Sequence, residues 1–116
     1  MRDGTTTVAA LMKLVDDFVT ARDWKPFHDP KNLSCSIAIE AGELMEHFQW
    51  LRTDQLEAVR HDEKKMQEIR EEIADSLAYV LSFADAMGID LSSSLQAKMK
   101  KNEVRYPEEE YRGKFT

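Results

Sequence analysis

The sequence has little cysteine, glycine or proline and no long hydrophobic run. It contains one Cys, four Gly and three Pro in 116 residues, and the lone cysteine, Cys35, cannot form a disulfide within the chain. No stretch approaches the roughly 18 apolar residues of a transmembrane helix, and the N-terminus lacks the basic and apolar segments of a signal peptide. We therefore expect a cytoplasmic protein with no membrane partner.

Positive charge is also scarce. The chain has 16 Lys and Arg residues against 22 Asp and Glu residues, which gives a formal net charge of -6. Binding to polymeric nucleic acid needs a basic face that neutralises phosphates, so neither DNA nor RNA is an expected partner. A small anionic ligand would need a metal ion or a local basic cluster to bind this chain.

Helix-forming sequence is abundant. The 42% hydrophobic content and the many Ala, Leu, Met, Glu and Lys residues are typical of an all-α protein, and the length suits one domain. Hydrophobic spacing predicts helices over residues 8–22, 34–51, 63–87 and 91–106, with a short helical segment over 54–60. We expect one four-helix-bundle-like domain over residues 1–107 and a mobile tail over 108–116.

Capping residues set these boundaries. One of three consecutive threonines caps the first helix, Asn32 or Ser34 the second, Asp54 the short segment and Asp90 the fourth helix, while Gly88 ends the third as a left-handed residue. Four helices with broad apolar faces would leave hydrophobic surface uncovered in a monomer. The expected state is therefore a homo-oligomer, and the choice between dimer and tetramer stays open.

One pattern occurs twice in the chain: Ile37-x-x-Glu40-x-x-Glu43 and Ile69-x-x-Glu72-x-x-Asp75. Each isoleucine belongs to a row of apolar residues along its predicted helix, here called the apolar seam. At 100° per residue, the two acids of each pair lie at about 300° and 240° from that isoleucine. Acidic pairs on a surface helix often serve solubility alone, but here both pairs have the same angular relation to their seams. If the seams pack, four carboxylates converge, and a divalent cation relieves their repulsion. An all-oxygen donor set favours Mg²⁺ or Mn²⁺.

The segment 23–32 is predicted to be irregular, because Pro26 and Pro30 forbid a continuous helix. It combines aromatic rings with polar atoms that can contact a ligand, namely those of Trp24, Phe27, His28 and Asn32. One reading is that the aromatic rings close the end of the bundle. The other is that they form the wall of a pocket in which a flat ring stacks.

Other metal and phosphate motifs are absent from the sequence. A di-iron bundle needs Glu-x-x-His on two helices, but Leu44 precedes His47 by three residues, Ala58 precedes His61 and Lys25 precedes His28. There is no His-Glu-x-x-His zinc motif and no Walker-type phosphate loop. Phosphates would therefore be bound through metal and through the basic face of the last long helix, which carries Lys98, Lys101, Asn102 and Arg105.

Several further segments match a known family in order and spacing: Trp24-x-x-Phe27-His28-x-Pro30-x-Asn32, Gly42-Glu43-Leu44, Phe48-Gln49-Trp50, Glu71-Glu72-x-x-Asp75-x-x-x-Tyr79 and Lys98-Met99-x-x-Asn102-x-x-Arg105-Tyr106-Pro107. Together with the Glu40-x-x-Glu43 pair, they resemble the all-α nucleoside triphosphate pyrophosphohydrolases of the MazG-like superfamily, and the dCTP pyrophosphatase branch in particular. One position departs from that branch, because Val15 stands where relatives can carry a histidine.

The resemblance implies a Mg²⁺ site and a nucleotide site. Glu40, Glu43, Glu72 and Asp75 would hold the metal, and Glu40, Glu43 and Glu72 would also be the catalytic acids. The nucleotide-binding residues that it implies are Trp24, Lys25, Phe27, His28, Asn32, Trp50, Tyr79, Lys98 and Asn102. The family cleaves a nucleoside triphosphate into a monophosphate and pyrophosphate as dimers or tetramers, with sites at subunit boundaries.

Hydrolysis of a nucleoside triphosphate by this chain is thus a hypothesis, and two alternative functions stay open. Water attacks the α-phosphorus with Glu43 or Glu40 as general base, and the sequence fixes neither the base residue nor the number of metal ions. A dUTP-type house-cleaning pyrophosphatase and a non-catalytic helical bundle that binds nucleotides or a partner are the alternatives. The preferred nucleobase, or a modified nucleotide as the true substrate, also stays open.

Overall fold

The structure is a computed structural model that describes residues 1–115 and is helical throughout, with no strand among those residues. The long helices are α1 (Val8–Thr20), α2 (Pro30–Glu46), α4 (Glu63–Met87) and α5 (Leu91–Arg105). The shorter elements are the 3₁₀ turns η1 (Lys25–Phe27) and η2 (Thr53–Gln55), together with α3 (Leu56–Val59) and α6 (Glu108–Tyr111). The predicted all-α class is confirmed.

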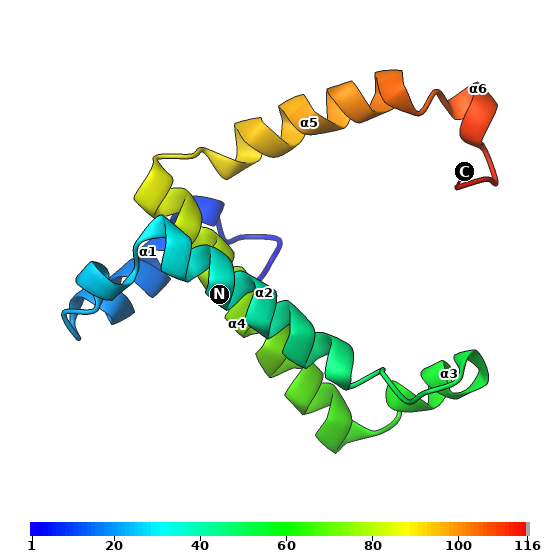
Figure 1. Ribbon diagram of the computed structural model, residues 1–116, viewed down its shortest axis with the longest axis horizontal. Helices are drawn as coiled ribbons and strands as arrows, with labels where there is room; N and C mark the ends of the chain where they lie inside the picture. The colour runs from blue at the N-terminus through cyan, green and yellow to red at the C-terminus, as the bar shows by residue number, and fades with distance from the viewer. Residues whose placement is uncertain (116) are drawn as a thin grey trace.

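Two long helices form the centre of the fold. α2 and α4 lie side by side as a hairpin, with α3 at the turn between them, and α1 packs against α4 near the opposite end of the hairpin (Figure 1). The buried apolar core is small and consists of Val19, Leu33, Val59, Leu81 and Ala84. The hairpin therefore fixes the relative positions of any side chains that α2 and α4 share.

The fourth long helix does not complete a bundle within this chain. α5 leaves the end of α4 and projects away from the α2–α4 hairpin, carrying α6 at its far end (Figure 1). No residue of α5 is buried. Within residues 1–115, the extensive packing between long helices is that of α4 with α2 and with α1.

The predicted boundaries of α4 and α5 are confirmed closely. α4 begins after Asp62 and ends at Gly88, whose φ of 65° is left-handed as expected. α5 begins after Asp90, whose side chain accepts a hydrogen bond from the Ser93 backbone N–H at 2.9 Å. In both cases a strong capping residue flanks the helix.

The predicted start and end of the second helix are wrong. α2 starts at Pro30, and its N-cap is Asp29, whose carboxylate accepts the Asn32 backbone N–H at 2.8 Å. Proline is tolerated at the first helical position because its missing N–H has no helical partner there. Neither Asn32 nor Ser34 is the cap, and α2 ends at Glu46, before Trp50.

One smaller expectation also differs from the structure. Asp54 lies inside the 3₁₀ turn η2 and does not cap the short segment, because that turn already begins at Thr53. Within the predicted mobile tail over 108–116, residues 108–111 form one helical turn, α6. The mobility of the tail and the domain boundary at residue 107 stay predictions. Residue 116 lies outside the described residues.

Candidate active site

Three acidic side chains converge between α2 and α4. Glu40 and Glu43 come from α2 and Glu72 from α4, and one carboxylate oxygen of each lies within 4.8 Å of the others. The two helices lie side by side (Figure 1), so the shared angular offset of the acid pairs becomes a shared location. The structure thus brings together three of the four predicted metal ligands.

The environment of this cluster disfavours negative charge. Burial, followed by the neighbouring acids Glu72, Glu43 and Asp75, raises the pKa of Glu40 from 4.5 to about 7. The pKa of Glu72 is raised as well, first by burial and then by the charges of Glu43 and Asp75, while its proximity to the Glu40 carboxyl opposes the shift. Such mutual destabilisation is what a bound cation removes.

The donor set fits a hard divalent cation. The Oε2 atoms of Glu40 and Glu72 are buried and have no hydrogen-bond partner among residues 1–115. Buried polar atoms without a partner are uncommon, and a metal ion would satisfy both. Because all the donors are carboxylate oxygens, Mg²⁺ or Mn²⁺ suits the cluster better than zinc or copper.

Asp75 occupies a less direct position. It is not part of the group of oxygens within 4.8 Å, but its charge contributes to the raised pKa of both Glu40 and Glu72. Its role as a fourth ligand stays a prediction.

Ser76 was not predicted as a site residue, although its Oγ is buried one turn after Glu72 and has no hydrogen-bond partner within the described part of the chain. The signal that could have identified Ser76 from the sequence was the position of this polar residue on the otherwise apolar face of α4.

The aromatic segment lies near the C-terminal half of α4. The His28 ring is tilted against the Tyr79 ring, with 6.3 Å between centroids, and Tyr79 follows Asp75 by one helical turn. Trp24 makes an edge contact with Phe18 at 5.8 Å, and Phe27 is 67% exposed. His28 and Tyr79 are therefore the predicted nucleotide contacts that the fold brings together.

Two other predicted nucleotide contacts already have partners within the chain. Lys25 Nζ lies 2.5 Å from Asp16 Oδ1 and 3.9 Å from Asp85 Oδ2, and its hydrogen bond with Asp16 raises its pKa above 10.5. The Asn32 amide donates to the Phe27 carbonyl at 3.0 Å and to Asp29 Oδ2 at 3.1 Å. Asn32 thus fixes the junction between η1 and α2.

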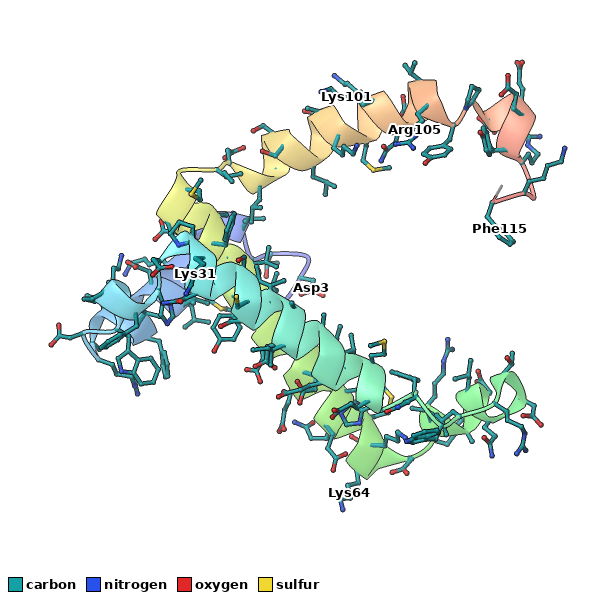
Figure 2. All side chains as sticks on the ribbon, viewed as in Figure 1. Asp3, Lys31, Lys64, Lys101, Arg105 and Phe115 are labelled. Carbon is teal, nitrogen blue, oxygen red and sulfur yellow. The ribbon has the colours of Figure 1, made fainter. Side chains whose placement is uncertain are left out.

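The remaining predicted contacts lie away from the acidic cluster. Lys98 and Asn102 are on α5, and Figure 2 shows their neighbours Lys101 and Arg105 on that projecting helix, far from the hairpin. Trp50 lies beyond the end of α2 and is 84% exposed. Within one chain, the structure does not bring these three side chains to Glu40 and Glu72.

Comparison with known proteins points to one family. The family model described as MazG-like matches residues 35–114. The chain is 34% identical over 101 residues to dCTP pyrophosphatase 1 of Mus musculus and 33% identical to that of Homo sapiens; each match covers 87% of this chain and 59% of the relative. This chain therefore spans about three fifths of those relatives.

A solved structure is also similar. The crystal structure of a pyrophosphatase from Archaeoglobus fulgidus has a TM-score of 0.80 and 37% sequence identity to this chain. The match covers 92% of this chain and 98% of the archaeal one. The overall helical arrangement seen here is therefore shared with a protein described as a pyrophosphatase.

Proposed function

The chain belongs to the MazG-like family, and on that premise we propose that it is a Mg²⁺-dependent nucleoside triphosphate diphosphatase that releases pyrophosphate. The observation that carries the proposal is the convergence of Glu40, Glu43 and Glu72 with buried carboxylate oxygens that have no other partner in the described chain. The named pyrophosphatase relatives support it.

A cytoplasmic location belongs to the proposal as well. Among residues 1–115, no helix has the length and hydropathy to cross a bilayer.

Glu40, Glu43, Glu72 and Asp75 would hold the metal. When bound, Mg²⁺, or Mn²⁺ in its place, neutralises phosphate charge and polarises the phosphoryl oxygens. This lets an acidic protein bind a polyanion.

The chemical step is a hydrolysis at the α-phosphorus. Water forms a bond to that phosphorus, the bond to the bridging oxygen breaks, and pyrophosphate leaves with that oxygen. Glu43 or Glu40 accepts the proton of the attacking water, because both carboxylates lie in the acidic cluster.

The proposed substrate is dCTP or a related or modified deoxynucleotide. The similarity to dCTP pyrophosphatases supports this choice. His28 and Tyr79 lie beside each other on the α4 side of the aromatic segment, where they can flank a base or sugar. A dUTP-type pyrophosphatase of similar helical design is the alternative enzyme.

We propose that the working form is a homo-oligomer. The accessible surface of the chain is 9486 Å², whereas a compact monomer of this mass exposes about 6,500 Å². Exposed apolar side chains on α2 and α5, including Ile39, Met45, Leu95 and Met99, are the surface that a second copy would cover. Contact with α5 of another copy would also bring Lys98 and Asn102 toward an acidic cluster.

A nucleotide screen tests the proposal. The full chain is incubated with each common and modified deoxynucleoside triphosphate and Mg²⁺, and pyrophosphate and orthophosphate are measured separately. Pyrophosphate together with the monophosphate is the expected result. Orthophosphate would indicate cleavage at another bond, and binding without any product would favour the non-catalytic bundle.

A further inference from the structure

Lys25 joins three elements through one ammonium group. It begins η1, and its Nζ lies 2.5 Å from Asp16 Oδ1 on α1 and 3.9 Å from Asp85 Oδ2 on α4, an arrangement here called the Lys25 bridge. The three side chains are 37–54% exposed, so each ion pair alone contributes little to the free energy of folding. One cation shared by two carboxylates is a small network, and its loss leaves two like charges near each other.

Apolar packing holds η1 only loosely against α4. No residue of η1 is buried, and a cavity of about 170 Å³ lies between α1, η1 and the C-terminal half of α4. Asp16, Lys25 and Asp85 line this cavity. Since a cavity lacks the van der Waals contacts of a packed interface, the polar contacts across it determine where η1 lies.

The backbone before η1 also depends on contacts with its surroundings. Asp23 has a φ of 53°, a left-handed conformation that a residue with a side chain adopts at a cost in free energy. The Trp24 N–H donates to the Val19 carbonyl at 3.1 Å, which fixes this turn to α1 but not to α4. The pair of Lys25 and Asp85 is therefore the ionic contact that links η1 to α4.

We propose that Lys25 is a positioning residue that does not contact the nucleotide: its bridge to Asp16 and Asp85 holds η1 in place and thereby keeps His28 beside Tyr79. The two rings lie 6.3 Å apart, one helical turn after the acid pair of α4. Loss of the bridge lets η1 move away from α4 and takes His28 with it. The effect on nucleotide binding rests on the proposed function, whereas the effect on η1 does not.

Hydrogen exchange without nucleotide tests the bridge itself. Amide exchange over residues 23–29 is followed by mass spectrometry in the unmodified full chain, in Lys25→Gln and in Asp16→Asn. Both variants are expected to exchange about two- to fivefold faster there, because η1 leaves its position more often without the bridge. Circular dichroism confirms that the helices are retained. Unchanged exchange over residues 23–29 in both variants would overturn the inference.

Lys13→Gln is the matched control. Lys13 forms an ion pair of 2.7 Å with Asp17 inside α1, so this variant loses the same kind of contact without separating two elements. Its exchange over residues 23–29 is expected to equal that of the unmodified chain. An equal acceleration in Lys13→Gln would show that any loss of positive charge from this end of the molecule has the effect, and would also overturn the inference.

Steady-state kinetics with dCTP and Mg²⁺ distinguishes a bridge from a direct substrate contact. Lys25→Gln is expected to raise KM about fivefold and to change kcat less than about twofold, since the acidic cluster is untouched. Asp16→Asn should raise KM as well, and the double variant should be no worse than Lys25→Gln, because both changes break one bridge. If Asp16→Asn left KM unchanged or lowered it, Lys25 would be a substrate contact and the positioning role would be refuted.

The two measurements separate this inference from the proposed function. Faster exchange over residues 23–29 in both variants, with no pyrophosphate released by the unmodified chain, would support the Lys25 bridge and refute the proposed activity. Pyrophosphate release by the unmodified chain, with unchanged exchange in both variants, would support the activity and refute the bridge.

Discussion

The acid pairs show that the relative positions of some side chains can be predicted from sequence. Glu40, Glu43 and Glu72 were predicted to converge because each pair has the same angular offset from an apolar seam, and the structure brings them within 4.8 Å. The ion pairs of Lys25 could not be predicted in the same way. Asp16 and Asp85 are distant from each other in sequence and meet only because α1 packs against α4.

Replacement of one half-buried acid should abolish metal-dependent activity. Glu72→Gln removes a charge that a cation requires but keeps the side-chain shape, so we expect pyrophosphate release to fall at least about 100-fold and Mg²⁺ affinity to weaken. Enzyme assays and calorimetric titration with Mg²⁺ measure the two effects. Glu71→Gln is the control, since Glu71 is exposed and its carboxylate accepts a hydrogen bond from Gln67 at 3.2 Å. Full turnover by Glu72→Gln would contradict the assignment.

The raised pKa of Glu40 predicts how pH changes the stability of the metal-free protein. The folded chain keeps a proton on Glu40 up to a pKa of about 7, whereas the unfolded chain releases it near 4.5. Folding therefore gains stability from this group below about pH 4.5 and loses it as pH rises through 7. Urea unfolding in chelator between about pH 5 and pH 8 measures this decline.

A variant and a metal addition isolate the Glu40 contribution. Glu40→Gln stays neutral at every pH, so the difference in its stability between the two pH values should be smaller than that of the unmodified chain. Glu46→Gln, at an exposed position near the end of α2, should behave like the unmodified chain. Mg²⁺ should restore stability at the higher pH, because it binds the ionised cluster in the folded state. An identical pH dependence for Glu40→Gln would refute this explanation.

At the scale of whole elements, helix ends were predictable where one strong signal stood alone. Asp62 and Gly88 flank α4, and no competing cap lies near either end. The start of α2 was misplaced because Pro30 was interpreted as a helix breaker, although proline fits the first helical turn. The projection of α5 was not predictable, since local sequence specifies a helix but not the helix against which it packs.

The reassigned N-cap of α2 can be tested directly. Asp29→Ala removes the acceptor of the Asn32 backbone N–H at 2.8 Å and should lower the free energy of unfolding by about 1 kcal/mol. Chemical denaturation monitored by circular dichroism measures the change. Lys31→Ala, a substitution at an exposed position in the first turn of α2, should have little effect. If Ser34→Ala costs more than Asp29→Ala, the cap has been assigned wrongly.

The whole molecule exposes more surface than its mass requires, with only five buried apolar residues among residues 1–115. On α5, Leu95 is 64% exposed and shares a face with Met99. We expect Leu95→Glu to weaken self-association, measured by sedimentation equilibrium across a dilution series. Lys100→Glu, on the opposite side of α5, should leave the association state unchanged. A monomeric unmodified chain with a high melting temperature would contradict the proposed homo-oligomer.

The projection of α5 has a consequence for mixtures of defective copies. If the acids of one copy work with the Lys98 of another, then Glu72→Gln and Lys98→Ala are each inactive alone but carry complementary defects. Co-refolding equal amounts of the two produces mixed dimers in which one composite centre is intact and the other is doubly damaged. Since about half of the dimers are mixed and one of their two sites is intact, about a quarter of the unmodified activity would be recovered from two inactive variants, which is intragenic complementation.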